Sequence, residues 1–227
     1  MKFSVEFIDV LKKFSLINKD MYFVPGKVQT TMIGTKGTNS TLFFARAFTN
    51  TEIDQAFGIG DLSRFLAALK NFKEPEINVI EDKYLEIIEG QLKMQYTLTN
   101  PTYLMYKQEP EKIKPLSAGM AFQITKKDID IIKNMYGVFG SPHIYFQNSE
   151  DGFYVGVNNF ENPTSDIGSV KLGEPEVKGN FKAVISAPMF KIDSADYKLH
   201  ISLKGLVYFG NEKMEFFIPT EKKWSEL

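Results

Sequence analysis

The chain alternates four times between a stretch with helical periodicity and a pair of strand-like stretches. The helical stretches begin near Val5, Asp61, Thr125 and Ser186, roughly 60 residues apart. Within them, apolar residues recur every three to four positions, so they gather on one side of a helix. The sequence therefore predicts four repeats of a helix followed by a β-hairpin.

The second helical stretch, residues 61–72 (DLSRFLAALKNF), shows the pattern most clearly. Leu62 and Phe65 fall on the apolar side, whereas Arg64 and Lys70 fall on the polar side, which carries almost no acid. A helix with one apolar and one polar face packs on a core and exposes its polar side.

Capping residues support the predicted starts of the third and fourth helices. Thr125 is followed three positions later by Asp128, as in a capping box. Ser186 is a suitable N-cap, and Pro188 fits the first turn of a helix because the missing N–H has no partner there. We therefore expect helices from Thr125 and from Ser186.

The strand-like stretches are rich in β-branched and aromatic residues and flank short turn signals. Proline presets φ and glycine accepts positive φ at such turns. The predicted hairpins are residues 21–33 around PGK, 84–98 around EGQ, 143–157 around NSEDG and 197–210 around LKG. Consecutive hairpins with helices on one face indicate an α+β fold with antiparallel sheets.

A stretch without periodicity separates the second repeat from the third. Residues 100–119 contain three prolines, at positions 101, 110 and 115, and are predicted to be a connector. The chain is therefore predicted to form two similar domains, residues 1–107 and 108–227, each with two helices packed on antiparallel sheet.

Composition narrows the class of protein without naming a function. The chain has 227 residues, 43% of them hydrophobic, a net charge of −1 and no cysteine. The hydrophobic content is sufficient for a large core. The absence of cysteine excludes disulfides and thiolate metal sites. A net charge near zero does not indicate that the chain as a whole binds nucleic acid. The N-terminus does not resemble a signal peptide and no apolar run has membrane-spanning length, so we expect a soluble intracellular protein.

No catalytic arrangement is evident. The sequence GIGDLS at Gly58 lacks the third glycine of a dinucleotide fingerprint, and GTKGT at Gly34 has the wrong order for a P-loop. His143 and His200 have no second histidine or carboxylate at ligand spacing, which favours structural roles. We expect no catalytic residue, no metal site and no cofactor, and hence not an enzyme.

Charge is distributed unevenly, because basic residues outnumber acids in the four helical stretches although the whole chain is slightly negative. Solubility of the helices is one explanation, since lysine and arginine are good helix formers. Contact with DNA phosphates is the other, since such residues bind the backbone without reading sequence. The basic residues are Lys12, Lys13, Arg64, Lys70, Lys73, Lys126, Lys127, Lys133 and Lys191.

Three stretches, with their order and spacing, resemble one protein family. They are MKFSVEFIDVLKKFSLIN at the start, residues 61–90 from DLSRFLAALKNF to YLEIIEG, and residues 180–209 from NFKAVISAPMFKI to KGLVYF. The family is the DNA polymerase sliding clamp, or processivity factor, of T-even-type tailed phages. The resemblance extends over nearly the whole chain, with the connector matching least well.

The resemblance implies a DNA-clamp fold and a homotrimer closed head to tail into a ring. The helices would line a central hole occupied by duplex DNA, with the nine basic residues facing it. The clamp would tether the phage replicative polymerase, be loaded by an ATP-driven clamp loader, and allow a further role as a mobile activator of late transcription. Its place would be the cytoplasm of the infected bacterial host.

The resemblance also implies a hydrophobic pocket for the C-terminal tails of partners. The candidates to lie near it are connector residues Tyr103, Leu104, Met105 and Tyr106; anchoring of the connector to the core is their alternative role. Two other functions remain open: a phage structural protein that forms rings or tubes without tethering DNA, and a carboxylate hydrolase, for which the sequence shows no site pair.

Overall fold

The computed structural model describes residues 1–33, 43–104, 120–174 and 179–227. They form two compact units. The first contains residues 1–33, 44–104 and 212–214, and the second contains residue 43 and residues 120–174, 179–211 and 215–227. The predicted boundary between residues 107 and 108 lies outside the described residues.

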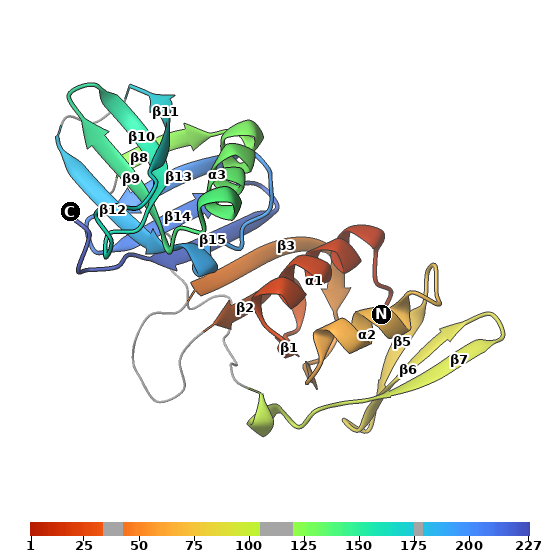
Figure 1. Cartoon of the computed structure of the whole chain (residues 1–227). Helices are drawn as coiled ribbons and strands as arrows, with labels where there is room; N and C mark the ends of the chain where they lie inside the picture. The colour runs from red at the N-terminus through yellow and green to blue at the C-terminus, as the bar shows by residue number, and fades with distance from the viewer. Residues whose placement is uncertain (34–42, 105–119, 175–178) are drawn as a thin grey trace. The chain divides into compact units, whose positions relative to one another are not determined.

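The first unit combines two helices with short antiparallel sheets (Figure 1). β1 pairs with β4, β2 lies next to β3, and β5, β6 and β7 form a meander. The elements are α1 (Val5–Ile17), β1 (Met21–Phe23), β2 (Gly26–Ile33), β3 (Phe43–Ile53), β4 (Phe57–Ile59), α2 (Leu62–Leu69), β5 (Glu76–Ile80), β6 (Tyr84–Glu89), β7 (Leu92–Thr97) and the 3-10 helix η1 (Pro101–Tyr103).

Phenylalanines hold the first unit together. Phe7 of α1, Phe23 of β1, Phe57 of β4 and Phe65 of α2 are all buried. The rings of Phe23 and Phe57 stack with their centroids 4.4 Å apart, and Phe65 meets Phe23 edge-on at 6.5 Å. Each such ring contributes about 1.5–3 kcal/mol by leaving water, so this cluster fixes α1 and α2 on the β1–β4 pair.

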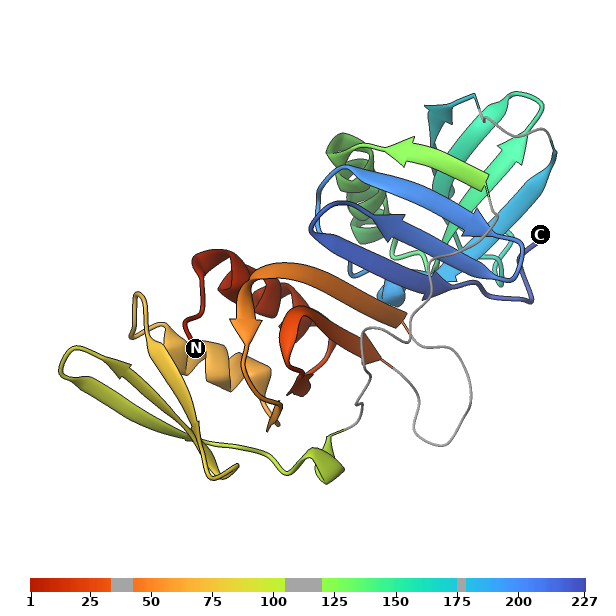
Figure 2. The same ribbon diagram turned by 180° about the vertical axis from the view of Figure 1, so that it is seen from behind.

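The second unit has two antiparallel sheets and one long helix (Figure 2). One sheet has the order β11-β10-β9-β12, and the other contains the run β15-β14-β13-β8. The elements are β8 (Met120–Ile124), α3 (Lys126–Phe139), β9 (His143–Ser149), β10 (Gly152–Asn158), β11 (Gly168–Gly173), β12 (Phe181–Ser186), the 3-10 helix η3 (Ala187–Met189), β13 (Tyr197–Ser202), β14 (Leu206–Gly210) and β15 (Met214–Pro219).

The core of the second unit lies between its two sheets. Phe146 of β9 and Phe209 of β14 are fully buried and their ring centroids lie 6.0 Å apart. Buried and more exposed residues alternate along the first part of β13, as expected for a strand with one buried face. The helix α3 packs on β10 and β11 and buries Ile129 and Ile132.

The α+β class, the antiparallel hairpins β6–β7, β9–β10 and β13–β14, and the capping box at Thr125 confirm the sequence predictions. The first predicted hairpin is wrong, because β1 pairs with β4 and not with β2. The side chain of buried Gln29 accepts the Val24 N–H at 3.1 Å and donates to the Val24 C=O at 2.7 Å. The backbone N–H and C=O of Val24 are therefore satisfied without a hairpin partner.

The fourth predicted helix, a short one, forms only as the three-residue 3-10 helix η3, with Ser186 at its N-cap position and Pro188 in its first turn as predicted. Ser186 makes no capping hydrogen bond with its side chain, although its backbone is extended. Phe190 and Ile192 are both buried while Lys191 between them is exposed. This spacing of two suits extended chain and cannot place both side chains on one face of a helix.

The glycines of GIGDLS have a packing role. A Cβ at Gly58 would lie 2.6 Å from the Thr99 carbonyl oxygen and 2.8 Å from Leu104 Cδ1. The Thr99 N–H donates to the Gly58 C=O at 2.9 Å. Glycine therefore allows the chain after β7 to lie directly on β4. The stretch GTKGT lies outside the described residues.

No described helix has both the length and the apolar composition needed to cross a bilayer.

Candidate nucleic-acid interface

The exposed face of α2 carries positive charge and no acid. Ser63, Arg64, Ala67 and Lys70 are exposed along it. The helix begins at Asp61, whose carboxylate accepts the Arg64 N–H at 2.9 Å. That hydrogen bond, and Lys19 at 3.6 Å, lower the pKa of Asp61. The one acid at this helix is thus engaged in capping, and the outer face remains basic.

The exposed face of α1 is less basic than its sequence suggests. The Lys12 Nζ lies 2.8 Å from the Asp9 carboxylate, so its charge is partly neutralised. Val5 and Leu16 are also exposed on this helix, and Lys13 is half-buried. Since α1 packs beside α2 (Figure 1), the two helices together present a mixed surface whose positive charge is concentrated on α2.

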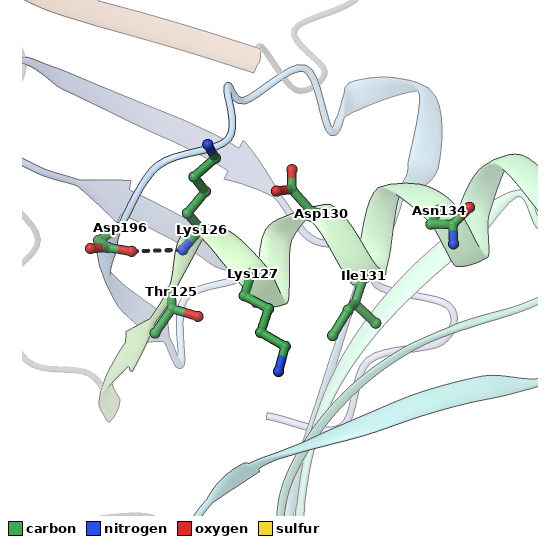
Figure 3. Close-up of a pocket in the computed structure, with 7 residues that line it drawn as sticks. All are labelled: Thr125, Lys126, Lys127, Asp130, Ile131, Asn134 and Asp196. Atoms are coloured by element: carbon green, nitrogen blue, oxygen red, sulfur yellow. Dashed lines mark hydrogen bonds between the residues drawn. The ribbon is translucent and has the colours of Figure 1, made fainter.

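At the start of α3, the chain's own groups occupy the helix N-terminus (Figure 3). The Asp196 carboxylate accepts the Lys126 N–H at 2.7 Å, and Thr125 and Asp128 form the capping box. The exposed cations Lys126 and Lys127 stand next to these groups. The N–H groups of Lys126 and Asp128 are therefore satisfied, and the attraction for an anion here comes mainly from the lysine side chains.

A wide groove of about 670 Å³ follows this end of α3. In Figure 3, Lys127 and Ile131 project from the same side of the helix. The lining residues are Thr125, Lys126, Lys127, Asp130, Ile131, Asn134 and Asp196. Among the described residues, Lys70, Lys126 and Lys127 make no ion pair, so their charges are available to a ligand.

Lys133 differs from these exposed lysines. It is half-buried, and its Nζ donates to Ser194 Oγ at 3.2 Å. Burial lowers the pKa of Lys133, while Asp193 and Asp130 act in the opposite direction. Asp193 in turn accepts a short hydrogen bond from the Tyr197 hydroxyl. Lys133 is therefore directed at the segment before β13.

The two remaining basic residues lie outside the helices. Lys73 follows α2 and is exposed, and its N–H donates to the Glu89 carboxylate at 3.0 Å. Hydrogen bonds from the N–H groups of Lys73 and Glu74 lower the pKa of Glu89. Lys191 is exposed in extended chain after η3.

Of the four connector residues proposed for the partner pocket, the two that the structure describes differ in exposure. Leu104 is only 7% exposed and contacts Gly58, whereas Tyr103 is 82% exposed. Leu104 therefore fastens the chain to β4, and Tyr103 points into solvent. Met105 and Tyr106 lie outside the described residues.

Two sheet edges that the sequence did not reveal are open. Within the described residues, β7 and β11 each pair on one side only. β7 contacts α2 through the rings of Tyr96 and Phe65, 5.1 Å apart, and β11 packs on α3. β11 itself was not predicted, since its sequence GSVKLG carries only weak alternation and two glycines.

Comparison with known proteins gives one curated relative and many solved structures. No family model matches the chain. The sliding clamp of Vibrio phage KVP40 is 24% identical over 226 residues, which cover 97% of this chain and 99% of that protein.

The solved structures share the fold at low identity. Proliferating cellular nuclear antigen (PCNA) from Entamoeba histolytica has a TM-score of 0.69 at 13% identity, with 97% of both chains covered. PCNA from A. fulgidus, solved with the C-terminal region of FEN-1, has a TM-score of 0.62 at 16% identity, with 94% of both chains covered. The beta clamp of Helicobacter pylori, solved with a DNA ligase peptide, has a TM-score of 0.67 at 11% identity and covers 97% of this chain and 65% of its own.

The resemblance drawn from the sequence and the fold therefore agree: this chain has the fold of a DNA sliding clamp and is similar along nearly its whole length to a phage sliding clamp.

Proposed function

We propose that this protein is a sliding clamp that encircles duplex DNA and tethers the phage replicative polymerase. The observation that carries the proposal is the similarity to a phage sliding clamp over 97% of the chain, together with the clamp fold. A clamp confers processivity by holding the polymerase on its template and has no catalytic activity of its own.

Exposed lysine and arginine side chains support the contact with DNA. Arg64 and Lys70 on α2, and Lys126 and Lys127 on α3, are exposed on the outer faces of their helices. Such residues attract phosphates and displace counterions without distinguishing bases. The DNA contact of the proposed clamp is therefore independent of sequence. Of the nine basic residues, these four are the best placed to make it.

Three chains closed head to tail would form the ring. The open edges β7 and β11 belong to different units of the chain, so joining one to the other is a heterologous contact, which closes into a ring when the rotation permits. Ile167 directly precedes β11, and Val138 lies on α3, the helix that packs on β11; they are 60% and 71% exposed. Apolar side chains next to an open edge support an interface there.

The same proposal names further partners. An apolar C-terminal tail of the polymerase would bind near Tyr103 and Leu104, where an exposed aromatic stands next to an anchored leucine. An ATP-driven clamp loader would open and close the ring, and late-transcription factors are further candidates. The place of action would be the cytoplasm of the infected bacterium.

Retention by topology is the test, because a ring holds DNA without gripping it. The protein is loaded onto a nicked circle with the loader and ATP, salt is raised, and the circle is then cut. We expect retention on the circle, because topological linkage is insensitive to the salt that dissociates phosphate contacts, and rapid loss after linearisation.

Two controls define the result. Linear DNA with both ends blocked by bound protein should retain the clamp, whereas open-ended linear DNA should not. Equal retention on circles and on open-ended linear DNA would contradict the clamp and favour an ordinary binder. No retention on either would favour a ring- or tube-forming structural protein.

A further inference from the structure

The last residues of the chain lie along the outer edge of β12. The Glu226 N–H donates to the Lys182 C=O at 2.7 Å, and the Lys182 N–H donates to the Glu226 C=O at 2.8 Å. Further along, the Glu221 N–H donates to the Val184 C=O at 2.7 Å, and the Val184 N–H donates to Ser225 Oγ at 3.0 Å. The outward polar groups of Lys182 and Val184 are therefore all paired.

Side chains fasten this C-terminal segment, residues 221–227, to the unit. The Trp224 ring stacks on Phe160 with centroids 5.7 Å apart and meets His143 at 6.1 Å. Lys182 pairs with the Glu226 carboxylate, and its Nζ also lies 5.6 Å from the centre of the Phe160 ring. The segment thus has one aromatic anchor and one ion pair in addition to its backbone hydrogen bonds.

Among the described residues, no further strand pairs with the opposite edge of the same sheet. The order β11-β10-β9-β12 leaves β11 and β12 as the two edges, and the C-terminal segment covers β12 alone. An uncovered edge presents a row of N–H and C=O groups that pairs readily with another chain. One edge of this sheet is thus filled and the other is open.

We propose that the β12 edge is a strand-docking surface that the chain fills with its own C-terminal segment, and that this keeps a second copy of the chain out. The competing occupant is the β12 edge of another copy. Two such edges can pair antiparallel about a twofold axis, because each presents the same N–H and C=O groups of Lys182 and Val184. Filling the edge in the same chain leaves β11 for the head-to-tail contact, so this inference rests on the proposed ring.

Removing residues 221–227 tests the proposal by amide hydrogen exchange. At low micromolar concentration we expect the Lys182 and Val184 amides, which face the C-terminal segment, to exchange at least about tenfold faster. The Ala183 amide, which faces β9 in the alternating pattern, should keep its rate. As concentration is raised, light scattering should show species larger than those of the full chain, and protection of Lys182 should return.

A point variant covers the case in which the truncated chain does not fold. Glu226→Pro removes the N–H that donates to the Lys182 C=O and leaves Trp224 in place. Lys222→Ala, an exposed change in the same segment, is the matched control and should alter neither exchange nor mass. Unfolding of the truncated chain would appear as loss of Ala183 protection, and Glu226→Pro would then decide.

Two results would overturn the inference. One is an unchanged exchange rate at Lys182 in the folded truncated chain, or a Glu226→Pro variant that keeps both the exchange rates and the mass distribution of the full chain. The other is a mass distribution of the truncated chain equal to that of the full chain at every concentration. Failure of the clamp proposal would appear instead in the circle-retention assay with the full chain, so the two failures are distinguishable.

Discussion

Thr125 is the N-cap residue of α3 and forms a capping box with Asp128. Its Oγ1 accepts the Asp128 N–H at 3.3 Å, and its own N–H and Oγ1 both donate to the Asp128 carboxylate. We expect Thr125→Ala to lower the free energy of unfolding by about 1 kcal/mol, the usual loss for an N-cap. Urea unfolding measures it. Thr125→Ser keeps the hydroxyl and should stay close to the parent, and equal losses for both variants would contradict the capping role.

Lys133 provides a second single-residue prediction, because its charge is half-buried. Lys133→Met keeps an apolar stem and should retain stability, whereas Lys133→Glu brings a carboxylate near Asp193 and Asp130 and should destabilise the protein. The pair of variants is compared by urea midpoint at neutral pH. A Lys133→Glu variant as stable as Lys133→Met would show that the charge at position 133 does not interact measurably with Asp193 and Asp130.

The lowered pKa of Lys133 also has a pH consequence. Because the folded pKa is below the ordinary value of 10.5, the folded state releases this proton first as pH rises. The unfolded state then binds more protons, so this residue adds stability between the folded pKa and 10.5. Relative to Lys133→Met, the parent protein should therefore gain stability as pH rises through that window. A constant difference between the two proteins from neutral pH to pH 10.5 would contradict the shift.

At the scale of elements, α2 is the helix whose exposed charge most clearly suits DNA. We expect Arg64→Gln with Lys70→Gln to weaken direct binding to duplex DNA by about threefold or more and to reduce its salt dependence. Stability should change by less than about 0.5 kcal/mol, since both side chains are exposed. Gel-shift titration at several salt concentrations measures the binding.

The matched control for α2 removes the same charge elsewhere in the first unit. Lys2→Gln with Lys27→Gln changes two exposed lysines, one before α1 and one on β2. If binding depends on total charge alone, the two double variants will weaken it equally. If the α2 face makes the contact, the control will bind as the parent does.

Elements also show where reasoning from sequence succeeds and where it fails. Local patterns are sufficient for α2 and α3, because an apolar stripe and a cap such as Thr125 lie within a few residues of each other. The pairing of β1 with β4 joins residues more than 30 positions apart, such as Met21 and Ile59, and no local pattern predicts that. The turn η3 is short because burial of Phe190 and Ile192 prevails over a favourable start.

In the candidate interface too, features set by neighbouring residues could be predicted from the sequence, and features set by distant residues could not. The exposed lysines and arginine of α2 and α3 could be predicted from periodicity alone. The pairing of Lys12 with Asp9 could also be anticipated, because residues three apart meet on a helix. The contact of Lys133 with Ser194 could not, since 61 residues of chain separate them.

At the scale of the whole molecule, the proposed ring makes a prediction about mass. The chain weighs 25.9 kDa, and a closed ring of three should weigh three times as much at micromolar concentration. If the open edge β11 and the exposed side chains beside it form the subunit contact, Val138→Glu with Ile167→Glu should shift the mass toward a single chain. The cause would be two carboxylates placed in an apolar contact in every subunit interface.

The control for the ring must carry the same chemical change on a surface outside that contact. Leu203→Glu alters a side chain that is 66% exposed on the turn between β13 and β14, away from β11 in sequence and in sheet order. Light scattering across a concentration series should show this variant with the mass of the parent, while the Val138 and Ile167 double variant dissociates at concentrations where the parent does not. A double variant that keeps the parent mass while folded would exclude the β11 edge from the interface. A parent that stays at 25.9 kDa throughout would contradict the ring itself.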